Sequence, residues 1–402
     1  MEINIIAKKI NKMGGKLYYV GGYVRDELMK VNPKDIDLCV VGLTPENFKN
    51  MFPKAFLKGD FFPVFQLNNH DFAFARRETK IGIGHKNFTF ETENVTIYDD
   101  LARRDFTINS IAKDVLTGEI IDPFNGQKDI ENKIIRATSN HFNEDPLRVY
   151  RGAQFATRFN FRINEETKKM MKLMKSELYS LSSERVFTEL RKALKSDTPS
   201  TFFNILRELD LLKVHFKEIE DLIDVPQPIK YHPEGDVYNH SMIALDMAAK
   251  LTTDEKIRFA ALTHDLGKAK TPKEILPHHY DHEKNGIAPL KEFCKKLNIP
   301  NAWKKLAQVS VKEHMRAGLY NNMSIPKKVE FLERNEKFLC ELEIIAISDK
   351  GPRSNEKISF FEIGKKMFNE VNGKTVNLPN NENAKGILHQ KRIEWLKKEN
   401  HF

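Results

Sequence analysis

The segment DIDLCVV carries two aspartates, Asp35 and Asp37, separated by one apolar residue. If the segment is a strand, both carboxylates lie on one face, because successive side chains of a strand point to opposite faces. Two like charges at this spacing destabilise an ordinary sheet face, whereas a hard cation such as Mg²⁺ binds oxygen ligands and removes the repulsion. The pair therefore predicts a magnesium site for phosphoryl or nucleotidyl transfer, with a solvated edge strand as the alternative.

A glycine pair lies shortly before these aspartates. Gly21 and Gly22 follow a strand predicted over residues 17–20 and precede a helix predicted over residues 23–29. Glycine lets the backbone approach a phosphate closely, the first amides of a helix can bind an anion, and Arg25 adds a guanidinium group. The arrangement predicts a phosphate site, with a tight turn and an exposed arginine as the alternative.

The segment LARRDFTIN offers further groups that suit a nucleotide. Guanidinium groups such as that of Arg104 match triphosphate oxygens, and a carboxylate such as that of Asp105 matches ribose hydroxyls. We expect these residues to precede a helix over residues 106–112, because apolar side chains recur through that stretch.

The segment EDPLRVYR begins the helical part of the chain. Asp145, Arg148 and Arg151 are spaced so that they lie roughly along one face of the predicted helix, where their donors and acceptors could meet the edge of a base. Pro146 suits a first-turn position, and acids favour the positive end of a helix dipole. Capping of the helix is therefore the alternative reading of these residues.

Histidines and aspartates recur at helix-length intervals in the C-terminal half. The pair His264 and Asp265 follows an apolar helical segment, and Gly267 and Lys268 come directly after it. Histidine and carboxylate donors from several helices suit a divalent metal that activates water for phosphoester hydrolysis, whereas a single histidine is usually structural. The candidate ligands are His240, His264, Asp265, His278, His279, His282, His314 and Asp349.

Two different patterns position these groups. Up to about residue 135, short apolar runs alternate with turn signals, which predicts an α+β head with a mixed sheet. From residue 145 the apolar period becomes that of an α-helix. The predicted helices cover residues 147–159, 165–174, 184–194, 199–212 and 387–398.

Prolines suggest where the helical part divides. Pro226, Pro228 and Pro233 cluster in one segment, and proline discourages a helix from continuing because it has no backbone N–H group. The domain prediction is a head over residues 1–140, an all-α neck and body over 141–228, an all-α histidine-bearing domain over 229–350 and a helical tail over 351–402.

The composition is that of a soluble globular chain. The 402 residues are 40% hydrophobic and 30% charged, with a mean hydropathy of −0.51, which excludes disordered, collagen-like and membrane classes. Cys39, Cys294 and Cys340 form no CxxC pair, which argues against zinc-finger and disulfide scaffolds. The N-terminal segment lacks the apolar core of a signal peptide, so we expect a cytoplasmic protein.

The chain is basic, with a net charge of +9 and a pI near 9.1. Residues 288–402 contain 22 basic and 14 acidic residues, so most of the surplus lies in the last third. This distribution predicts a C-terminal surface that binds a polyanion, with an ordinary solvated helical face as the alternative.

The motifs taken together resemble a known family. The segments GGYVRDEL, DID, LARRDFTIN, DPFNG, EDPLRVYRGAQF and SSERVFTELRKAL occur in the order found in the class II tRNA nucleotidyltransferases, the bacterial CCA-adding enzymes and their relative poly(A) polymerase. The resemblance implies a polymerase-β-like head in which Asp35 and Asp37 hold the catalytic Mg²⁺. It implies triphosphate contacts from Gly22, Arg25, Arg104 and Arg151, a ribose contact from Asp105, and a protein template for CTP or ATP formed by Glu144, Asp145 and Arg148.

The histidine pattern resembles the HD phosphohydrolase superfamily. A nucleotidyltransferase head joined to an HD domain is similar to one subgroup of bacterial CCA-adding enzymes, and poly(A) polymerase lacks that domain. The resemblance implies 2',3'-cyclic phosphodiesterase, 2'-nucleotidase and phosphatase activity with Ni²⁺ or Mg²⁺. The implied ligands are His240, His264, Asp265 and Asp349, with His282 and His314 added in a two-metal site and His278 and His279 beside the ligands.

One residue departs from the family pattern. Gln154 stands where bacterial relatives carry an arginine, which removes a positive charge near the phosphates. The segment RRETKIGIGH resembles the flexible loop that relatives need for switching from C to A addition, so a CC-only enzyme is disfavoured. We expect tRNA, CTP and ATP as partners, no membrane association, and a monomer or homodimer. The alternatives are an A-adding or poly(A) polymerase and a non-catalytic tRNA-binding protein.

Overall fold

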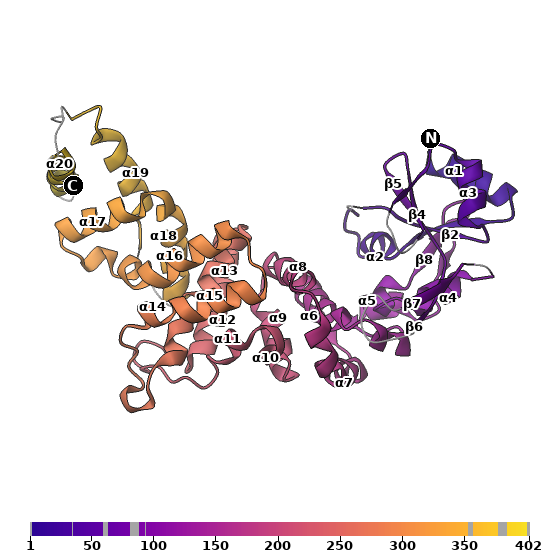
Figure 1. Ribbon diagram of the computed structural model, residues 1–402, viewed down its shortest axis with the longest axis horizontal. Coiled ribbons are helices and arrows are strands. Elements are labelled where there is room, and N and C mark those ends of the chain that lie inside the picture. The colour runs from indigo at the N-terminus through magenta and orange to yellow at the C-terminus, as the bar shows by residue number, and fades with distance from the viewer. Residues whose placement is uncertain are drawn as a thin grey trace. The chain divides into compact units, whose positions relative to one another are not determined.

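The computed structural model describes residues 2–33, 35–58, 63–80, 88–92, 94–352, 357–376 and 384–399 (Figure 1). Its internal contacts divide the chain into two compact units, Met1–Ser182 and Ser183–Phe402. The predicted α+β head followed by helical regions is confirmed. The domain limits at residues 140, 228 and 350 stay predictions. Within the described part of the chain, no helix is long and apolar enough to cross a membrane.

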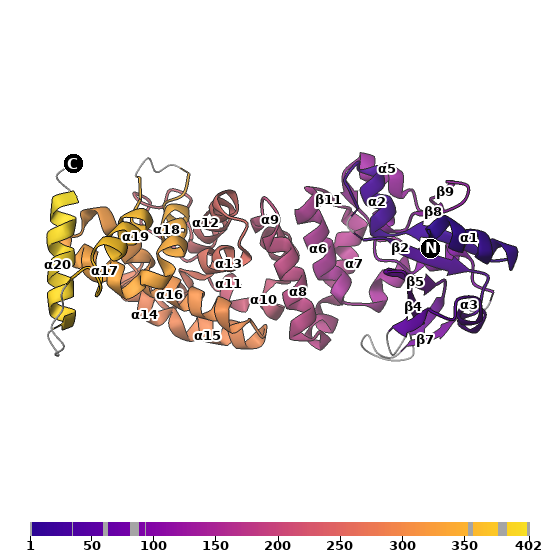
Figure 2. The same cartoon turned by 90° about the horizontal axis from the view of Figure 1, so that it is seen from above.

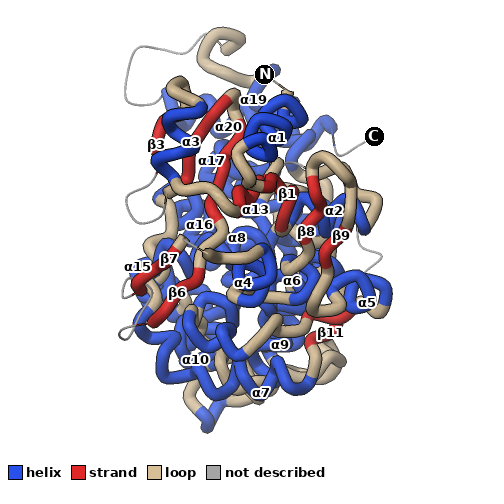
Figure 3. The backbone as a smooth tube through the Cα atoms, turned by 90° about the vertical axis from the view of Figure 1, so that its right-hand side faces the viewer, coloured by secondary structure: helices blue, strands red, loops and turns tan. Residues whose placement is uncertain are grey.

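The first unit is built on a mixed sheet of seven strands, drawn red in Figure 3. Neighbouring strands are antiparallel except β2 and β5, which are parallel. Tyr19 on β1 pairs with Leu38 on β2, so the end of β1 lies beside the start of β2. The strand order is β3 (Phe56–Lys58), β4 (Val64–Leu67), β5 (His70–Phe74), β2 (Asp37–Val41), β1 (Lys16–Val20), β8 (Ala112–Asp114) and β9 (Ile120–Ile121).

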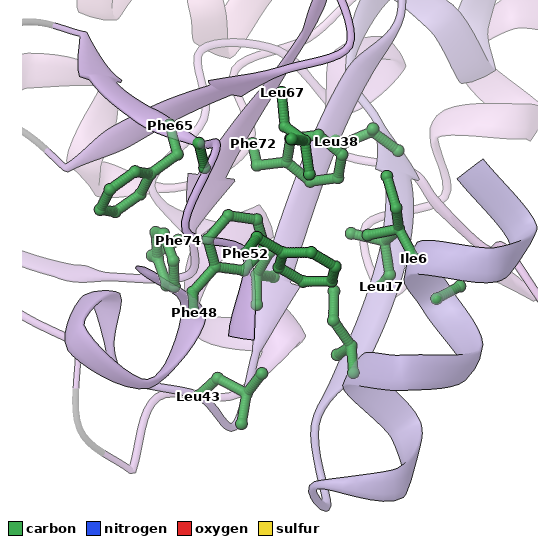
Figure 4. Close-up of a cluster of buried hydrophobic side chains, with 14 residues drawn as sticks. Ile6, Leu17, Leu38, Leu43, Phe48, Phe52, Phe65, Leu67, Phe72 and Phe74 are labelled. Carbon is green, nitrogen blue, oxygen red and sulfur yellow. The ribbon is translucent and has the colours of Figure 1, made fainter. Parts of the chain in front are cut away.

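A cluster of aromatic side chains fixes one face of this sheet (Figure 4). Helices α1 (Ile3–Lys12) and α3 (Pro45–Met51) supply residues that pack against strand residues in this cluster. The Phe48 ring lies at its centre, with the ring centroids of Phe52, Phe65, Phe72 and Phe74 4.9 to 5.5 Å away. Offset and edge-on aromatic packing of this kind adds to the free energy of burial, so the strands that carry the site are held in register.

The remaining elements of the first unit surround the sheet. Strands β6 (Arg77–Lys80) and β7 (Phe88–Glu91) form an antiparallel pair, and β10 (Ile134–Ile135) and β11 (Arg162–Ile163) form a parallel pair. The helices are α2 (Gly22–Leu28), α4 (Ile97–Ala102), η1 (Thr107–Asn109), α5 (Gly126–Glu131), η2 (Asn140–Glu144), α6 (Leu147–Phe159), α7 (Glu165–Leu173) and η3 (Met174–Ser180), where η marks a 3₁₀ helix.

Two local predictions in this unit are wrong. No helix covers residues 106–112; the structure has η1 followed by strand β8, because Phe106, Ile108 and Ile111 are all fully buried rather than spread along one exposed helix. Strand β2 begins at Asp37, so Asp35 lies in a bend before it. In the β1–β2 register the residue opposite Asp35 would be Gly22, which already belongs to α2 and offers no strand partner.

The second unit is helical over its described residues. Helix α20 packs against α17 and α19, as Figures 1 and 2 show. The elements are α8 (Ser183–Leu194), α9 (Ser200–Glu208), α10 (Leu212–His215), α11 (Lys217–Glu220), α12 (Val237–Leu251), α13 (Glu255–Thr263), η4 (Leu266–Lys270), η5 (Lys273–Ile275), α14 (His282–Asn285), α15 (Ile287–Lys296), α16 (Asn301–Gly318), η6 (Tyr320–Asn322), α17 (Ile325–Asn335), η7 (Glu336–Phe338), α18 (Leu339–Lys350), α19 (Phe361–Glu370) and α20 (Ala384–Glu399).

The longer helices were predictable, with one exception. The helices expected over residues 147–159, 165–174, 184–194 and 387–398 correspond to α6, α7, α8 and α20. The helix expected over 199–212 is interrupted instead, with α9 ending at Glu208. Asp210 adopts a left-handed backbone with φ of 58°, which a continuous helix does not allow. The three cysteines are free, as expected.

A buried arginine joins three helices of the second unit. Arg258 on α13 donates hydrogen bonds of 2.5 to 2.9 Å to four backbone carbonyl oxygens. Two of these belong to Leu194 and Ser196 at and after the end of α8, and the others to Ala249 and Thr252 at the end of α12. The guanidinium thus satisfies carbonyls that have no partner within their own helices.

We predict that Arg258→Met lowers the free energy of unfolding by about 2–4 kcal/mol, because several buried carbonyls lose a charged donor. Urea denaturation followed by circular dichroism measures this change. Lys256→Met is the matched control on the same helix. The Lys256 ammonium group forms a surface ion pair with Asp254, so its loss should cost less than about 1 kcal/mol. Equal losses in the two variants would contradict the role given to Arg258.

We also predict a pH dependence from His215 on α10. Burial, assisted by the Lys296 ammonium group, lowers the pKa of His215 to about 4. Between that value and about 6.5, the usual histidine pKa, the unfolded chain binds more protons than the folded chain. The free energy of unfolding contributed by this residue therefore falls as the pH is lowered through this window, by at most about 1.4 kcal/mol per pH unit.

The variant His215→Gln tests this. Its free energy of unfolding should fall less between pH 7 and pH 5 than that of the unchanged protein, whatever its stability at pH 7. Urea denaturation at the two pH values gives the change in the free energy of unfolding for each protein. Equal changes in the two proteins would exclude His215 as the titrating group.

Candidate functional site

Asp37 lies beside the glycine turn. Gly21 has φ of +66°, a conformation that favours glycine, and a methyl group built on it would stand 2.9 Å from Arg104 Nη1 and 3.5 Å from Asp37 Oδ2. A methyl group on Gly22 would stand 3.4 Å from Arg25 Nη2 and 3.8 Å from Asp37 Oδ2. The two glycines therefore leave room between the carboxylate and two guanidinium groups.

The Asp37 carboxylate is crowded by charge. The Asp37 side chain is exposed, but the protein atoms around its carboxylate raise the pKa of Asp37. The Arg104 guanidinium lowers this pKa, and the Asp35 carboxylate raises it further. Asp71 on β5 lies opposite Asp37 in the sheet and accepts hydrogen bonds from Lys58 and Gln66. Sequence reasoning did not find Asp71, because only the β2–β5 pairing brings it to this place.

A buried carboxylate holds the neighbouring arginines. Asp100 on α4 is fully buried and accepts hydrogen bonds from both Arg103 and Arg104, the latter at 2.9 Å from Nη2. Burial would raise the pKa of Asp100, but the two guanidinium groups outweigh it and hold the pKa at about 2. Asp100 therefore positions Arg104 toward the glycine turn. It stands four residues before Arg104, which lies just after α4 ends at Ala102, and the sequence displays this spacing.

A chain of buried polar side chains links α2 to α6. Arg25, which is 4% exposed, donates to Asn109 Oδ1 at 2.6 Å, and Asn109 Nδ2 donates to Asp105 Oδ1 at 3.0 Å. Arg151 on α6 in turn donates to Asp105 Oδ2 at 2.8 Å. Burial would raise the pKa of Asp105, but Arg151 and Asn109 lower it. Three residues of the predicted nucleotide site, Arg25, Asp105 and Arg151, are thus gathered, and Asn109 is the link that the sequence analysis missed.

Three arginine guanidinium groups lie over the rings of two phenylalanines on α6. Phe155 and Phe159 are stacked, and Arg25 lies 5.5 and 4.8 Å from their ring centroids. Arg151 lies 5.1 Å from the Phe155 ring, and Arg158 lies 4.8 Å from the Phe159 ring. Cation–π contacts hold these positive groups close together despite their mutual repulsion. An anion placed among them would be strongly attracted.

Gln154, which departs from the family pattern, is buried on the same helix. Its Nε2 has no hydrogen-bond partner in the described part of the chain. Arg158 follows one helical turn later and approaches Asp26 to 4.0 Å. The helix thus still carries a guanidinium group near the position where the family arginine is missing.

The three residues of the predicted template lie at the start of α6. The Asp145 carboxylate accepts from the Leu147 amide at 3.0 Å, which is the capping arrangement. Glu144 Oε1 lies 2.7 Å from His141 Nδ1. Arg148 donates to the carbonyl oxygens of His141 and Arg103 at 2.6 Å each. Asp145 precedes the helix instead of lying on its face, but it stays close to Arg148, three residues later.

In the second unit, one aspartate faces two groups of ligands. Asp265, only 1% exposed, turns Oδ2 toward His264 Nε2 at 3.3 Å and His240 Nε2 at 3.7 Å. Its other oxygen, Oδ1, lies 3.4 Å from His314 Nε2 and 3.5 Å from His282 Nε2. Asp349 Oδ1 completes the first group at 2.9 Å from His240 Nε2. These six residues come from α12, α14, α16, α18 and the residues directly after α13.

Each histidine of the cluster is oriented through its other ring nitrogen. The Nδ1 atoms of His264 and His282 each donate to a backbone carbonyl at 2.7 Å, and His314 Nδ1 donates to the Ser310 carbonyl at 3.1 Å. His240 Nδ1 lies 2.8 Å from Glu234 Oε1. Because a carbonyl can only accept, Nδ1 carries the proton and Nε2 points inward as the metal-binding atom.

The donor set fits a pair of divalent metal ions. His264 Nε2 and both Asp265 oxygens are buried and make no well-formed hydrogen bond among the described residues. The groups His240–His264–Asp265–Asp349 and Asp265–His282–His314 each place one ligand atom per residue within 4.8 Å of the others. The Nε2 atoms of His282 and His314 approach to 3.1 Å, which is typical of two imidazoles that share a cation.

Charge interactions inside this cluster are strong. Burial alone would lower the pKa of His264, but Asp265 and Asp349 outweigh it and raise the pKa to about 10. Burial would raise the pKa of Asp265, yet His264 and Lys268 hold it well below the usual range. Lys268 Nζ lies 2.6 Å from Asp265 Oδ2 and 2.7 Å from Gln227 Oε1. Metal ligands of this kind must give up protons when they bind an ion.

The other two predicted histidines lie outside the ligand groups. His279 contacts Thr271 and the Pro226 carbonyl, and its own carbonyl orients His282. His278 stacks against Tyr280 with ring centroids 6.0 Å apart. Sequence reasoning missed Glu234, which only the folded chain brings to His240, and residues 81–87 of the predicted flexible segment lie outside the described residues.

Comparison with known proteins adds family assignments to this geometry. The family model of the poly(A) polymerase head domain matches residues 17–136, and that of the HD domain matches residues 237–350. The model of the probable RNA- and SrmB-binding site of polymerase A matches residues 160–223. The multifunctional CCA protein of Pseudoalteromonas atlantica is 44% identical over 308 residues, which are 74% of this chain and 75% of that protein.

Solved structures share the fold. A CCA-adding enzyme in complex with ATP matches with a TM-score of 0.65 at 20% identity, over 98% of this chain and 88% of that chain. A CCA-adding enzyme in complex with CTP matches with a TM-score of 0.66 at 21% identity, over 98% and 90% of the two chains.

We predict that Gly267→Ala lowers the metal content of the protein. A methyl group there would stand 1.9 Å from the His282 carbonyl oxygen and 2.6 Å from the Gly286 nitrogen, so α14 must move and take His282 with it. Elemental analysis after dialysis against Ni²⁺ measures the ions bound per chain. Gly386→Ala on α20 is the control and should keep the full content, because a methyl group there would meet no described residue within 4 Å outside its own helix. Unchanged metal content in Gly267→Ala would show that the position of α14 does not determine how many metal ions the protein binds.

Proposed function

The chain belongs to the family of multifunctional CCA proteins, the CCA-adding tRNA nucleotidyltransferases with an HD phosphohydrolase domain, and from this premise we propose how its two sites work. The head extends the 3' end of tRNA with C, C and A from CTP and ATP. The HD domain hydrolyses phosphoesters. The observation that carries the proposal is the presence in one chain of a glycine turn facing Asp37 and of a buried carboxylate, Asp265, facing two histidine groups.

In the head, Asp35 and Asp37 are the proposed ligands of Mg²⁺. Bound there, Mg²⁺ would supply activation of the attacking 3' hydroxyl and stabilisation of the leaving pyrophosphate. The glycine turn leaves space for phosphate oxygens, and Arg104 faces that space because Asp100 holds it. Arg25 and Arg151 add positive charge from either end of the buried polar chain through Asn109 and Asp105.

Nucleotide selection is proposed to take place at the start of α6. Glu144, Asp145 and Arg148 are the proposed template that pairs with the Watson–Crick edge of CTP or ATP. Support comes from the fixed position of Arg148, whose guanidinium is bound to two carbonyls and is therefore pre-oriented. Asp105 is proposed to approach the ribose while it also holds Arg151.

In the HD domain, the proposed reactions are 2',3'-cyclic phosphodiesterase, 2'-nucleotidase and phosphatase activity. Ni²⁺ or Mg²⁺ held by His240, His264, Asp265 and Asp349, with His282 and His314 for a second ion, would supply an activated water for attack on phosphorus. Glu234 keeps His240 in place, and Lys268 compensates the charge of Asp265. Together these activities would remove phosphates from damaged RNA 3' ends.

The tRNA body is the proposed partner of the basic C-terminal third. The charge surplus of residues 288–402 supports phosphate contacts there, and such contacts weaken steeply with salt. The chain is proposed to be cytoplasmic and to act as a monomer or homodimer. An A-adding or poly(A) polymerase stays the alternative for the head.

We predict that the two activities separate by mutation. Asp37→Asn should reduce nucleotide addition roughly a hundredfold or more and leave hydrolysis of adenosine 2',3'-cyclic phosphate unchanged. His264→Ala should do the reverse, because the two carboxylate sites lie in different units. Incorporation of labelled CTP and ATP into tRNA that lacks its 3' CCA measures the first activity, and chromatography of the nucleotide products measures the second.

The same assay separates the alternatives. Sequencing of the extended tRNA should show C, C and A in that order. Incorporation of ATP alone would identify an A-adding enzyme, and loss of both activities in either single variant would contradict two independent sites.

A further inference from the structure

A cavity of about 550 Å³ lies directly beside the metal-ligand groups of the HD domain. His240 and Asp349, two of the candidate ligands, form part of its wall. Two other cavities of similar volume in the same unit, about 540 and 600 Å³, have none of the candidate ligands in their walls. The first cavity is therefore the one of the three from which a bound molecule could reach the cluster.

Apolar and aromatic residues form part of the wall of this cavity. Ile243 on α12 and Met315 on α16 line it, and Leu319, directly after α16, lines it with half of its surface exposed. Tyr231 from the loop before α12 also lines it, and its side chain is 70% exposed. Large exposed apolar and aromatic side chains gathered in a concave site are typical of a ligand-binding surface.

Positive charge accompanies the apolar wall. Lys350 directly follows the ligand Asp349, and Lys230 directly precedes Tyr231, with its Nζ 5.3 Å from the Tyr231 ring centroid. The cavity thus offers metal ligands and lysines for an anionic group and an aromatic, apolar surface for a flat ring. Its volume lies in the range that holds small ligands and exceeds what a phosphate group alone would fill.

We propose that this cavity binds the nucleoside part of the HD-domain substrate, with Tyr231 stacking on the base and Met315 and Leu319 covering it. The proposal rests on the phosphohydrolase function proposed above, whose substrates carry a 2'-phosphate or a 2',3'-cyclic phosphate on a ribonucleoside, and it adds the residues that contact the base. Stacking of a base on an aromatic side chain contributes enough binding free energy to favour such substrates over phosphoesters without a base. Tyr231 is then a specificity-determining residue, which touches the base and not the reacting phosphate.

Steady-state kinetics of Tyr231→Ala with two phosphomonoesters test the proposal. For adenosine 2'-monophosphate, KM should rise about tenfold while kcat stays within about twofold. For glycerol 2-phosphate, which has the same kind of ester but no base, KM and kcat should both stay within about twofold. Tyr231→Phe should restore the value of the unchanged protein, because a phenyl ring also stacks.

Tyr280→Ala is the matched control. Tyr280 is a tyrosine of the same domain with 69% of its surface exposed, and it does not line the cavity. The expected result is unchanged kinetics with both substrates. An equal effect of Tyr231→Ala on the two substrates, or no effect on either, would overturn the proposal.

A binding measurement separates this proposal from the phosphohydrolase function. With methionine methyl groups labelled with ¹³C, addition of adenosine should shift the Met315 resonance, identified by its loss in Met315→Leu. The shift should vanish in Tyr231→Ala. If the protein hydrolyses neither ester and the Met315 resonance still moves, the proposed function fails and the nucleoside site stands. If the esters are hydrolysed and Met315 does not respond to adenosine, the nucleoside site fails alone.

Discussion

A carboxylate removed from water must be surrounded by positive charge or hydrogen-bond donors, and both sites of this protein are organised around carboxylates under that constraint. In the first unit, Asp100 is fully buried and holds two arginines, of which Arg104 lies beside the glycine turn. In the second unit, Asp265 is almost fully buried and has histidines on two sides. The first carboxylate is neutralised by the protein itself, whereas the second leaves buried ligand atoms that a metal ion would satisfy.

Close backbone approach is the second requirement shared by the two sites. Gly21 lets the chain pass between Asp37 and Arg104, and Gly267 lets the short helix α14 bring His282 to the ligand cluster. At both places a single methyl group would collide with a charged group or a backbone atom of the site. The glycines therefore determine distances between groups that are far apart in sequence or carried by separate elements.

Local sequence patterns predicted most of the longer helices and the cluster of histidines and aspartates in the second unit, and predicted the contacts of other residues poorly. The His264–Asp265 pair and the helices α6 and α8 follow from local spacing, because neighbouring residues determine those features. The two aspartates of the DID segment do not share a strand as expected, since Asp35 lies in a bend before β2. Asp71 could not be found in this way, since only strand pairing brings it beside Asp37. Asn109 and Glu234 lie near Asp105 and His240 in the sequence, but their types and spacing did not show which neighbours they contact. The failed helix over residues 106–112 has the same origin, because burial on several sides overrides an apolar period.

The arginine that joins α8, α12 and α13 limits how far the protein can be divided into modules. Two of the four carbonyls bound by Arg258 belong to residues 194 and 196, and Ser200 on α9 donates to Asp246 on α12. A recombinant fragment that began at residue 229 would contain every metal ligand of the HD domain and lack these supports. The HD domain thus takes part of its framework from helices that precede its family boundary at residue 237, and these helices belong to the same compact unit, which begins at Ser183.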